Sequence, residues 1–127
     1  MTAARAKQKP SLQVKRVYAP AAKDDGFRVL VDRLWPRGLT KEKARVDLWL
    51  KDVAPSDALR RRVHGDPSQW NDFLSAYARE LARDPAKSAA AALRERMRRE
   101  PVTLLYGARN EIHNNATALK DWLEQSR

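Results

Sequence analysis

The chain has 127 residues and no cysteine, and its 26 Lys and Arg residues exceed its 16 Asp and Glu residues by ten. This length fits one compact domain, and the lack of cysteine excludes disulfides, thiol nucleophiles, iron–sulfur clusters and thiolate zinc sites. His64 and His113, the only two histidines, lie far apart in the sequence, so we expect neither a metal nor a cofactor.

The positive charge is spread over the chain. We expect residues 1–11 to form a disordered basic tail, followed by a single α/β domain over residues 12–127. Arg5, Lys7 and Lys9 lie in the tail, which leaves seven of the ten excess positive charges on the domain and makes an anionic partner the expected one. Neither an apolar run of about 18 residues nor a signal-peptide core occurs, so we expect a cytoplasmic protein without a membrane segment.

Three segments have the composition of β-strands. Residues 12–18 are rich in β-branched side chains, and residues 27–35 open with a nearly continuous apolar run that is typical of a strand buried on both faces. Residues 102–106 form a second such run. The loop between the first two strands has only about nine residues, which is short for a parallel crossover and leaves their pairing open.

Capping residues predict where two short helices begin. Thr40 can cap a helix over residues 41–45, and Ser56 can cap one over residues 57–63. Between these helices, residues 46–53 form a connecting segment.

Three longer helices are predicted from periodic apolar residues. An Asp-Pro pair opens the first two, at Asp66 and at Asp84. The third begins near His113, Asn114 or Asn115. Their apolar faces are Trp70, Phe73, Leu74, Tyr77 and Leu81 in the first, Ala86, Ala89, Ala90, Leu93 and Met97 in the second, and Ala116, Leu119, Trp122 and Leu123 in the third. The order of elements predicts a single three-layer α/β domain with a small, mainly parallel sheet flanked by helices.

Both buried strands run into polar segments, residues 32–38 and 106–115. Ligands of open α/β sheets bind at the carboxyl ends of the strands. If the two strands are parallel and close, one rim of the sheet collects Asp32, Arg33, Arg37, Arg109, Glu111 and His113. Arginines offer paired donors to phosphate or carboxylate, and the start of the last helix adds backbone N–H groups.

We therefore expect an anion-binding pocket at this rim for a small ligand that bears a phosphate or a carboxylate. Its expected ligand-binding residues are Arg33, Trp35, Arg37, Tyr106, Arg109, Asn114 and Asn115. Asp32, Glu111 and His113 are the candidates for catalytic acid–base groups. Spacing alone does not define a reaction, so the sequence leaves open whether the protein is an enzyme.

These side chains also have structural interpretations. Asp32 can form an internal ion pair with Arg33 or Arg109, and His113 can cap the last helix together with Asn114. The alternatives remain open at this point.

The same holds for the aromatic residues and the second histidine. Trp35 and Trp49 are more typical of a hydrophobic core than of a surface that stacks on bases. His64 stands at a helix end, where an imidazolium complements the helix dipole.

A second function class is a basic, nucleic-acid-associated binding protein. It would use the tail and a helix face formed by Arg94, Arg96, Arg98 and Arg99, although Glu95 and Glu100 dilute the charge of that face. Residues 57–73 lack the features of a recognition helix, and no glycine-rich nucleotide-binding motif occurs. The small anionic ligand is therefore the leading expectation, and the oligomeric state is not apparent.

Several segments resemble the YeaO-like family, a branch of the larger domain of unknown function 488 group. They are VKRVY, RVLVDRLWPRGLTKEKARVDLWLKDVAPS, DPSQW and PVTLLYGARNEIHNNA, and the likeness extends from about Leu12 to Leu123. The resemblance implies a small α/β domain and no particular activity. Family-typical positions would be Asp32, Arg33, Trp35, Pro36, Arg37, Gly38, Trp49, Lys51, Asp52, Tyr106, Glu111, His113, Asn114 and Asn115. More distant branches carry cysteines near the last strand, where this chain has Tyr106, so no thiol mechanism transfers.

Overall fold

The computed structural model describes residues 12–65 and 67–125, without the side chains of residues 62–67. The predicted tail at residues 1–11, the predicted cap at Asp66 and the expected role of the His64 side chain therefore lie outside the described residues.

Four parallel strands form one sheet in the order β1-β4-β2-β3. They are β1 (Leu12–Arg16), β2 (Phe27–Leu30), β3 (Leu48–Trp49) and β4 (Val102–Tyr106). β4 pairs with both β1 and β2, which settles the pairing that the sequence left open: the first two strands are parallel but not adjacent. The first two strands are shorter than predicted, and the two-residue β3 was not predicted.

The predicted helices are present. They are α2 (Lys41–Ala44), α3 (Asp57–Gly65), α4 (Trp70–Leu81), α5 (Ala86–Met97) and α6 (Asn115–Gln125), with short 3-10 turns at Lys23–Asp25, Lys51–Val53 and Pro67–Gln69. Thr40 Oγ1 accepts from the Lys43 N–H and Ser56 Oγ accepts from the Leu59 N–H, as the sequence predicts. α4 begins at Trp70, later than predicted, because residues 67–69 form a 3-10 turn before it.

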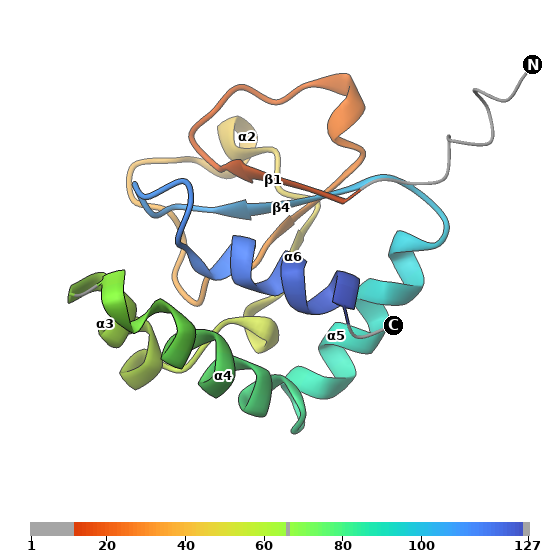
Figure 1. Ribbon diagram of the computed structural model, residues 1–127. Helices are drawn as coiled ribbons and strands as arrows, with labels where there is room; N and C mark the ends of the chain where they lie inside the picture. Colours follow the sequence, from red (N-terminus) through yellow and green to blue (C-terminus); the bar gives the residue numbers. More distant parts are fainter. Residues whose placement is uncertain (1–11, 66, 126–127) are drawn as a thin grey trace, which may run out of the picture.

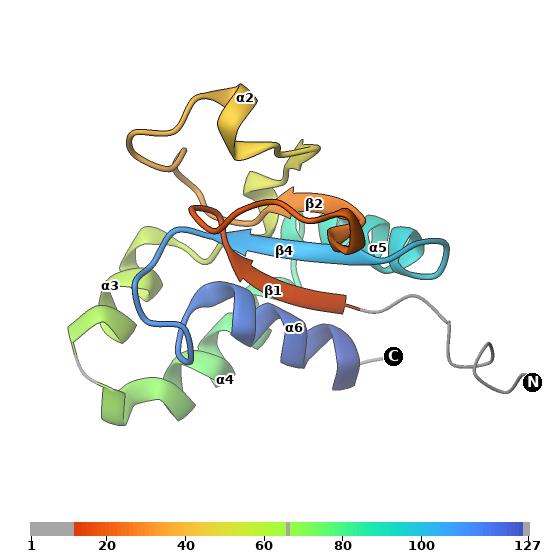
Figure 2. The ribbon, with the colours of Figure 1, turned by 90° about the horizontal axis from the view of Figure 1, so that it is seen from above.

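Helices α3 to α6 lie on one side of the sheet, and α2 with the long connections lies on the other (Figures 1 and 2). The larger core packs the apolar faces of α4, α5 and α6 against β2 and β4. A smaller core on the opposite face joins Val17, Leu30, Ala44 and Leu105, with Trp35 and Trp49 packed against it. The predicted α/β fold is thus confirmed, and its second helical layer is a single turn of helix.

A buried ionic network stands beside the smaller core. Asp25 and Arg28 are only 1% and 5% exposed. The Asp25 carboxylate accepts from Lys15 Nζ at 2.8 Å and from Arg28 Nη1 at 2.5 Å. Arg28 donates its other N–H groups to the carbonyls of Ala44 and Arg45, both at 2.9 Å. The network therefore ties β1 and β2 to the end of α2.

Candidate functional site

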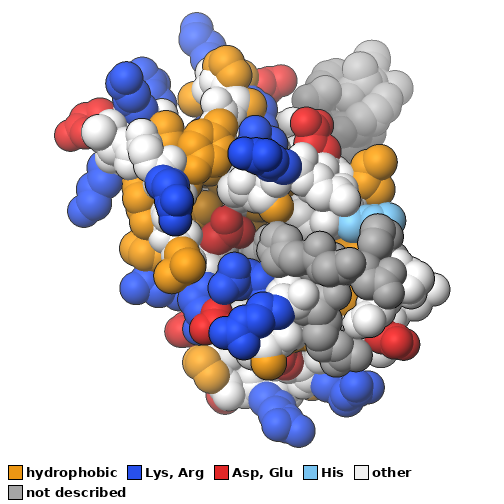
Figure 3. Space-filling model, turned by 90° about the vertical axis from the view of Figure 1, so that its left-hand side faces the viewer, with side chains coloured by type: hydrophobic (Ala, Val, Ile, Leu, Met, Phe, Trp, Pro, Cys, Tyr) orange, Lys and Arg blue, Asp and Glu red, His pale blue; other side chains and the backbone are white. Residues whose placement is uncertain are grey.

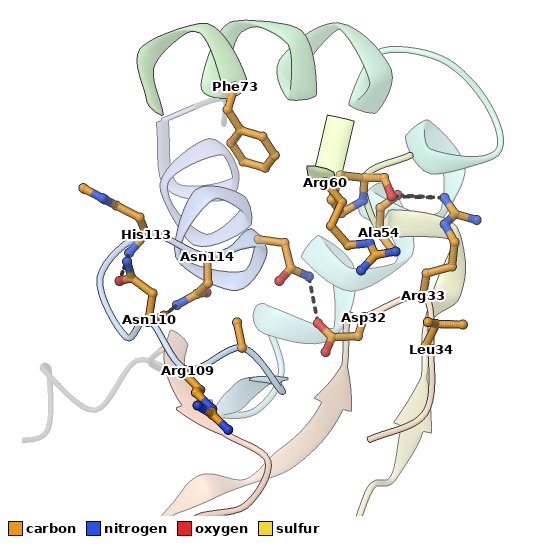
Figure 4. Close-up of a pocket in the computed structure, with 13 residues that line it drawn as sticks. Asp32, Arg33, Leu34, Ala54, Arg60, Phe73, Arg109, Asn110, His113 and Asn114 are labelled. Atoms are coloured by element: carbon orange, nitrogen blue, oxygen red, sulfur yellow. Dashed lines mark hydrogen bonds between the residues drawn. The ribbon is translucent and has the colours of Figure 1, made fainter. Parts of the chain in front are cut away.

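A cleft of about 510 Å³ opens at the carboxyl ends of β2 and β4. Its lining residues are Asp32, Arg33, Leu34, Ala54, Pro55, Arg60, Phe73, Ala108, Arg109, Asn110, His113, Asn114 and Asn115. They come from the loops after β2 and β4, from the short link between the 3-10 turn at Lys51–Val53 and α3, and from helices α3, α4 and α6 (Figure 4). Lys and Arg side chains are numerous on this end of the molecule (Figure 3).

Asp32 lies at the centre of the cleft, directly after β2 and Val31. Its Oδ1 accepts from Asn115 Nδ2 at 3.0 Å, and its Oδ2 accepts from the Gly107 backbone N–H at 2.8 Å. The same Asn115 amide also donates to the Val31 carbonyl at 3.0 Å. Burial raises the pKa of Asp32, against the opposing effects of these two hydrogen bonds and of the positive charge of Arg60.

Replacing Asp32 by asparagine should destabilise the fold more at pH 4.5 than at pH 7.5. In the variant, an N–H of the new side-chain amide faces the Asn115 Nδ2 donor, which lowers the free energy of unfolding by about 1–2 kcal/mol. Because burial raises the pKa of the folded carboxyl, its contribution to stability is complete below the unfolded pKa and falls as pH rises through the folded value. Urea unfolding of the wild type and the variant at the two pH values measures the difference in stability. A difference that grows with pH would contradict the raised pKa of Asp32.

Three arginines surround Asp32 at different positions. Arg60 extends from α3 toward the Asp32 side of the cleft (Figure 4), and its buried Nε has no hydrogen-bond partner in the described residues. Arg33 Nη2 instead donates to the carbonyls of Ala54 and Pro55 at 3.2 and 3.3 Å. Arg109 is exposed on the opposite wall from Arg33 (Figure 4).

Within the described residues, Asp32 forms no ion pair with Arg33 or Arg109. The ion pair considered from the sequence is therefore absent there. Arg33 donates to two backbone carbonyls instead, and the Asp32 carboxylate accepts from an amide and a backbone N–H.

The loop between β4 and α6 is fixed by its own polar side chains. Asn110 Oδ1 accepts from the His113 N–H, and Asn114 Oδ1 caps α6 by accepting from the Thr117 N–H, both at 2.9 Å. The His113 ring stacks on Trp70 with a centroid separation of 4.6 Å. The capping role considered for His113 thus belongs to Asn114, while His113 joins the loop to α4.

The structure brings together six of the residues that the sequence singled out. Asp32, Arg33, Arg109, His113, Asn114 and Asn115 all line the cleft. Tyr106 and Glu111 instead line a separate cavity of about 430 Å³ beside β1.

Trp35 and Arg37 also lie outside the lining of the cleft. Trp35 packs edge-on against Trp49 with centroids 5.4 Å apart, and its Nε1 donates to the Leu39 carbonyl. The carbonyl of Arg37 accepts from the Tyr18 hydroxyl. Both tryptophans therefore belong to the smaller core, in agreement with the structural interpretation.

Sequence reasoning missed Arg60 and Phe73 as lining residues. Arg60 is the first of three consecutive arginines, whose side chains point in different directions on a helix, so the run itself does not distinguish it. The Ser56 cap and the burial of Leu59 orient the first turn of α3, and that orientation carries Arg60 to the cleft. The available signal was the capped first turn, in which Leu59 is the one large apolar residue.

The basic face of α5 is largely occupied by contacts within the protein. Arg96 pairs with Glu100 at 2.8 Å, and Arg98 pairs with Glu95 at 3.1 Å. The Arg94 guanidinium lies 4.5 Å from the centroid of the Trp122 ring. These contacts involve three of the four arginines of the expected nucleic-acid footprint, although Arg94 Nε and Nη2 have no hydrogen-bond partner in the described residues.

The described part of the chain lacks two further features. None of its helices has the length and apolar character needed to cross a membrane. No group of three or more His, Asp or Glu side chains gathers there in a way that could hold a metal ion.

Comparison with known proteins identifies relatives along nearly the whole chain. A family model described as "Inactive DUF488-N3 subclade" matches residues 11–127. The chain is 42% identical over 113 residues to uncharacterized protein YeaO of Escherichia coli, covering 89% of this chain and 96% of that protein. It is 43% identical over 112 residues to uncharacterized protein Rv3073c of Mycobacterium tuberculosis, covering 88% and 92%. No solved structure matches the chain at a significant level.

Proposed function

The chain belongs to the inactive DUF488-N3 subclade, and from this premise we propose that it is a non-catalytic binding domain for a small anion. The ligand, which bears a phosphate or a carboxylate, binds in the cleft at the carboxyl ends of the strands. Arg60 holds the anion, and Arg33 and Arg109 contribute positive charge from the two walls.

The observation that carries this proposal is the unpartnered Arg60 Nε. Its N–H is buried without an acceptor in the described residues, and a buried donor without a partner costs about 1–3 kcal/mol. The Nη2 group of the same guanidinium reaches Asp57 at 3.3 Å in a largely exposed pair, which contributes little. If the Arg60 guanidinium turns toward the cleft that it lines, an anionic ligand can supply the missing acceptor.

The placement of the acid–base candidates favours binding over catalysis. Glu111 is exposed and lines a different cavity from Asp32 and His113. His113 lies flat against Trp70. Catalysis needs an acid, a base and a reacting atom within hydrogen-bond reach of one another, and these three residues do not form such a group. The description of the subclade as inactive supports the same conclusion.

A thermal-shift panel tests the proposal. It covers phosphate, sugar phosphates, nucleotides, carboxylates and short oligonucleotides at low and moderate salt. A ligand present at about 100 times its dissociation constant adds roughly 2.7 kcal/mol, which raises the Tm of a domain of this size by several degrees. A salt-tolerant shift with a small anion supports the proposal. A shift with oligonucleotides alone, lost as salt rises, would instead favour the nucleic-acid alternative.

Replacing Arg60 by glutamine should weaken binding of the anion that raises the Tm in this panel by at least about tenfold, because a charge-assisted hydrogen bond contributes about 1.5–3 kcal/mol. Arg98→Gln is the matched control, since its side chain is 74% exposed on α5 and makes only a surface pair with Glu95. Isothermal titration of both variants measures the change. Equal affinities of the two variants would place the anion elsewhere on the protein.

A further inference from the structure

We propose that Asp32 makes the cleft selective for anions that carry a hydrogen-bond donor on or beside the charged group, such as hydrogen phosphate. This inference rests on the proposed function and deepens it, because it specifies which anions bind. It assigns to Asp32 the role of a specificity-determining residue.

The argument begins with the acceptor capacity of the Asp32 carboxylate. A carboxylate offers about four lone-pair sites on its two oxygens. One bond from Asn115 and one from the Gly107 N–H occupy one site on each oxygen. No other donor of the described residues forms a hydrogen bond with these oxygens, and Asp32 itself lines the cleft. Each oxygen therefore retains acceptor capacity for a ligand.

The other lining groups make this acceptor distinctive. Among the described residues that line the cleft, Asp32 is the only acidic side chain. Arg33, Arg60 and Arg109 have only donors to offer. The amide of Asn114 is engaged at both ends, because Nδ2 donates to the Asn110 carbonyl and Oδ1 accepts from the Thr117 N–H. Among the described lining residues, Asp32 is therefore the charged acceptor for a hydrogen-bond donor of the ligand.

A carboxylate in an anion-binding site distinguishes anions that can donate a hydrogen bond from anions that cannot. Arg60 attracts any anion into the cleft, but the Asp32 carboxylate repels an anion that has no proton to share. A ligand O–H between the two negative groups turns this repulsion into a charge-assisted hydrogen bond, which is short and strong. Hydrogen phosphate has such a proton at neutral pH, whereas sulfate does not.

The direct test compares inorganic phosphate and sulfate by isothermal titration at pH 7.5 and constant ionic strength. At this pH the two anions have nearly the same size and charge, so the difference is the proton. We expect the wild type to bind phosphate at least about tenfold more tightly, as the strength of a charge-assisted hydrogen bond implies. In Asp32→Asn the two affinities should fall within about threefold of each other, while Arg98→Gln should keep the wild-type ratio.

A second measurement needs no variant. Monofluorophosphate matches the charge and shape of hydrogen phosphate at pH 7.5 but lacks its hydroxyl proton. It should bind the wild type as weakly as sulfate does. This comparison remains informative if Asp32→Asn does not fold.

The outcomes separate the two proposals. If the wild type binds sulfate and phosphate equally and Arg60→Gln weakens both, the anion site stands and the role of Asp32 is refuted. The same holds if folded Asp32→Asn keeps the preference for phosphate. If neither anion binds the wild type, the proposed function fails for these anions, and the selectivity argued here fails with it.

Discussion

Asp25→Ala should lower the free energy of unfolding by about 3–5 kcal/mol, because it leaves the buried Arg28 guanidinium without its counter-charge. Lys15 loses its partner as well. Urea unfolding followed by circular dichroism measures the loss. Asp24→Ala is the control, since this neighbouring carboxylate is exposed. A loss below about 1 kcal/mol would mean that the carbonyls bonded to Arg28 suffice to hold its charge.

The cost of Asp25→Ala should also depend on pH. Burial alone would raise the pKa of Asp25, but hydrogen bonds from Lys15, the Ala22 N–H and Arg28 together hold it below its ordinary value. A lowered folded pKa gives stability that is present above the unfolded pKa and is lost as pH falls through the folded one. The difference between wild type and variant should therefore shrink below about pH 4. A difference that does not change down to pH 2 would show that the charge of Asp25 does not matter.

Gly26→Ala should destabilise the protein by about 3 kcal/mol, through backbone strain and a steric clash. Gly26 has φ 67° and ψ −134°, a conformation that residues with a Cβ rarely adopt. A Cβ at this position would lie 2.2 Å from the Pro101 carbonyl oxygen, so the backbone itself must move. That oxygen accepts from the Phe27 N–H at 2.9 Å at the start of β2, so a shift disturbs the sheet.

Gly38→Ala separates strain from clash. Gly38 also has a positive φ, 81°, but no atom lies within 4 Å of an added Cβ. It should cost only about 1 kcal/mol. Thermal unfolding of the two variants gives the comparison, and equal Tm losses would show that the contact with Pro101 is unimportant.

Local features of the sequence predicted the helices well. Thr40 and Ser56 cap helices as expected, and the periodic residues Phe73, Tyr77 and Leu81 are buried on one face of α4. Such features involve residues within one or two turns of each other, so the sequence contains the whole signal. Local features could not predict the strand order, because β1 and β2 both pair with a strand more than 70 residues away.

The position of the candidate site could be predicted from the sequence, but its full lining could not. The rule that ligands bind at the carboxyl ends of strands led to Asp32 and to the loop after β4. The direction of the chain after Asp32 depends on tertiary contacts. Trp49 Nε1 holds the Asp32 carbonyl at 2.8 Å, and Trp35 packs beside Trp49 in the smaller core. Because of these contacts, the chain carries Arg37 to the other face of the sheet. No local sequence pattern indicates such contacts.

The position of β4 has a consequence for how the chain folds during synthesis. β4 is the last strand to be made, yet it lies between β1 and β2, and β1 pairs with no other strand in the described sheet. β1 therefore has no pairing partner until the ribosome has added more than 80 further residues. Unpaired strand edges are prone to aggregation. A chain interrupted after α5 would lack the centre of the sheet and both hydrogen-bond donors to the Asp32 carboxylate, Gly107 N–H and Asn115 Nδ2. Chains of intermediate length should therefore depend on chaperones until the final segment emerges.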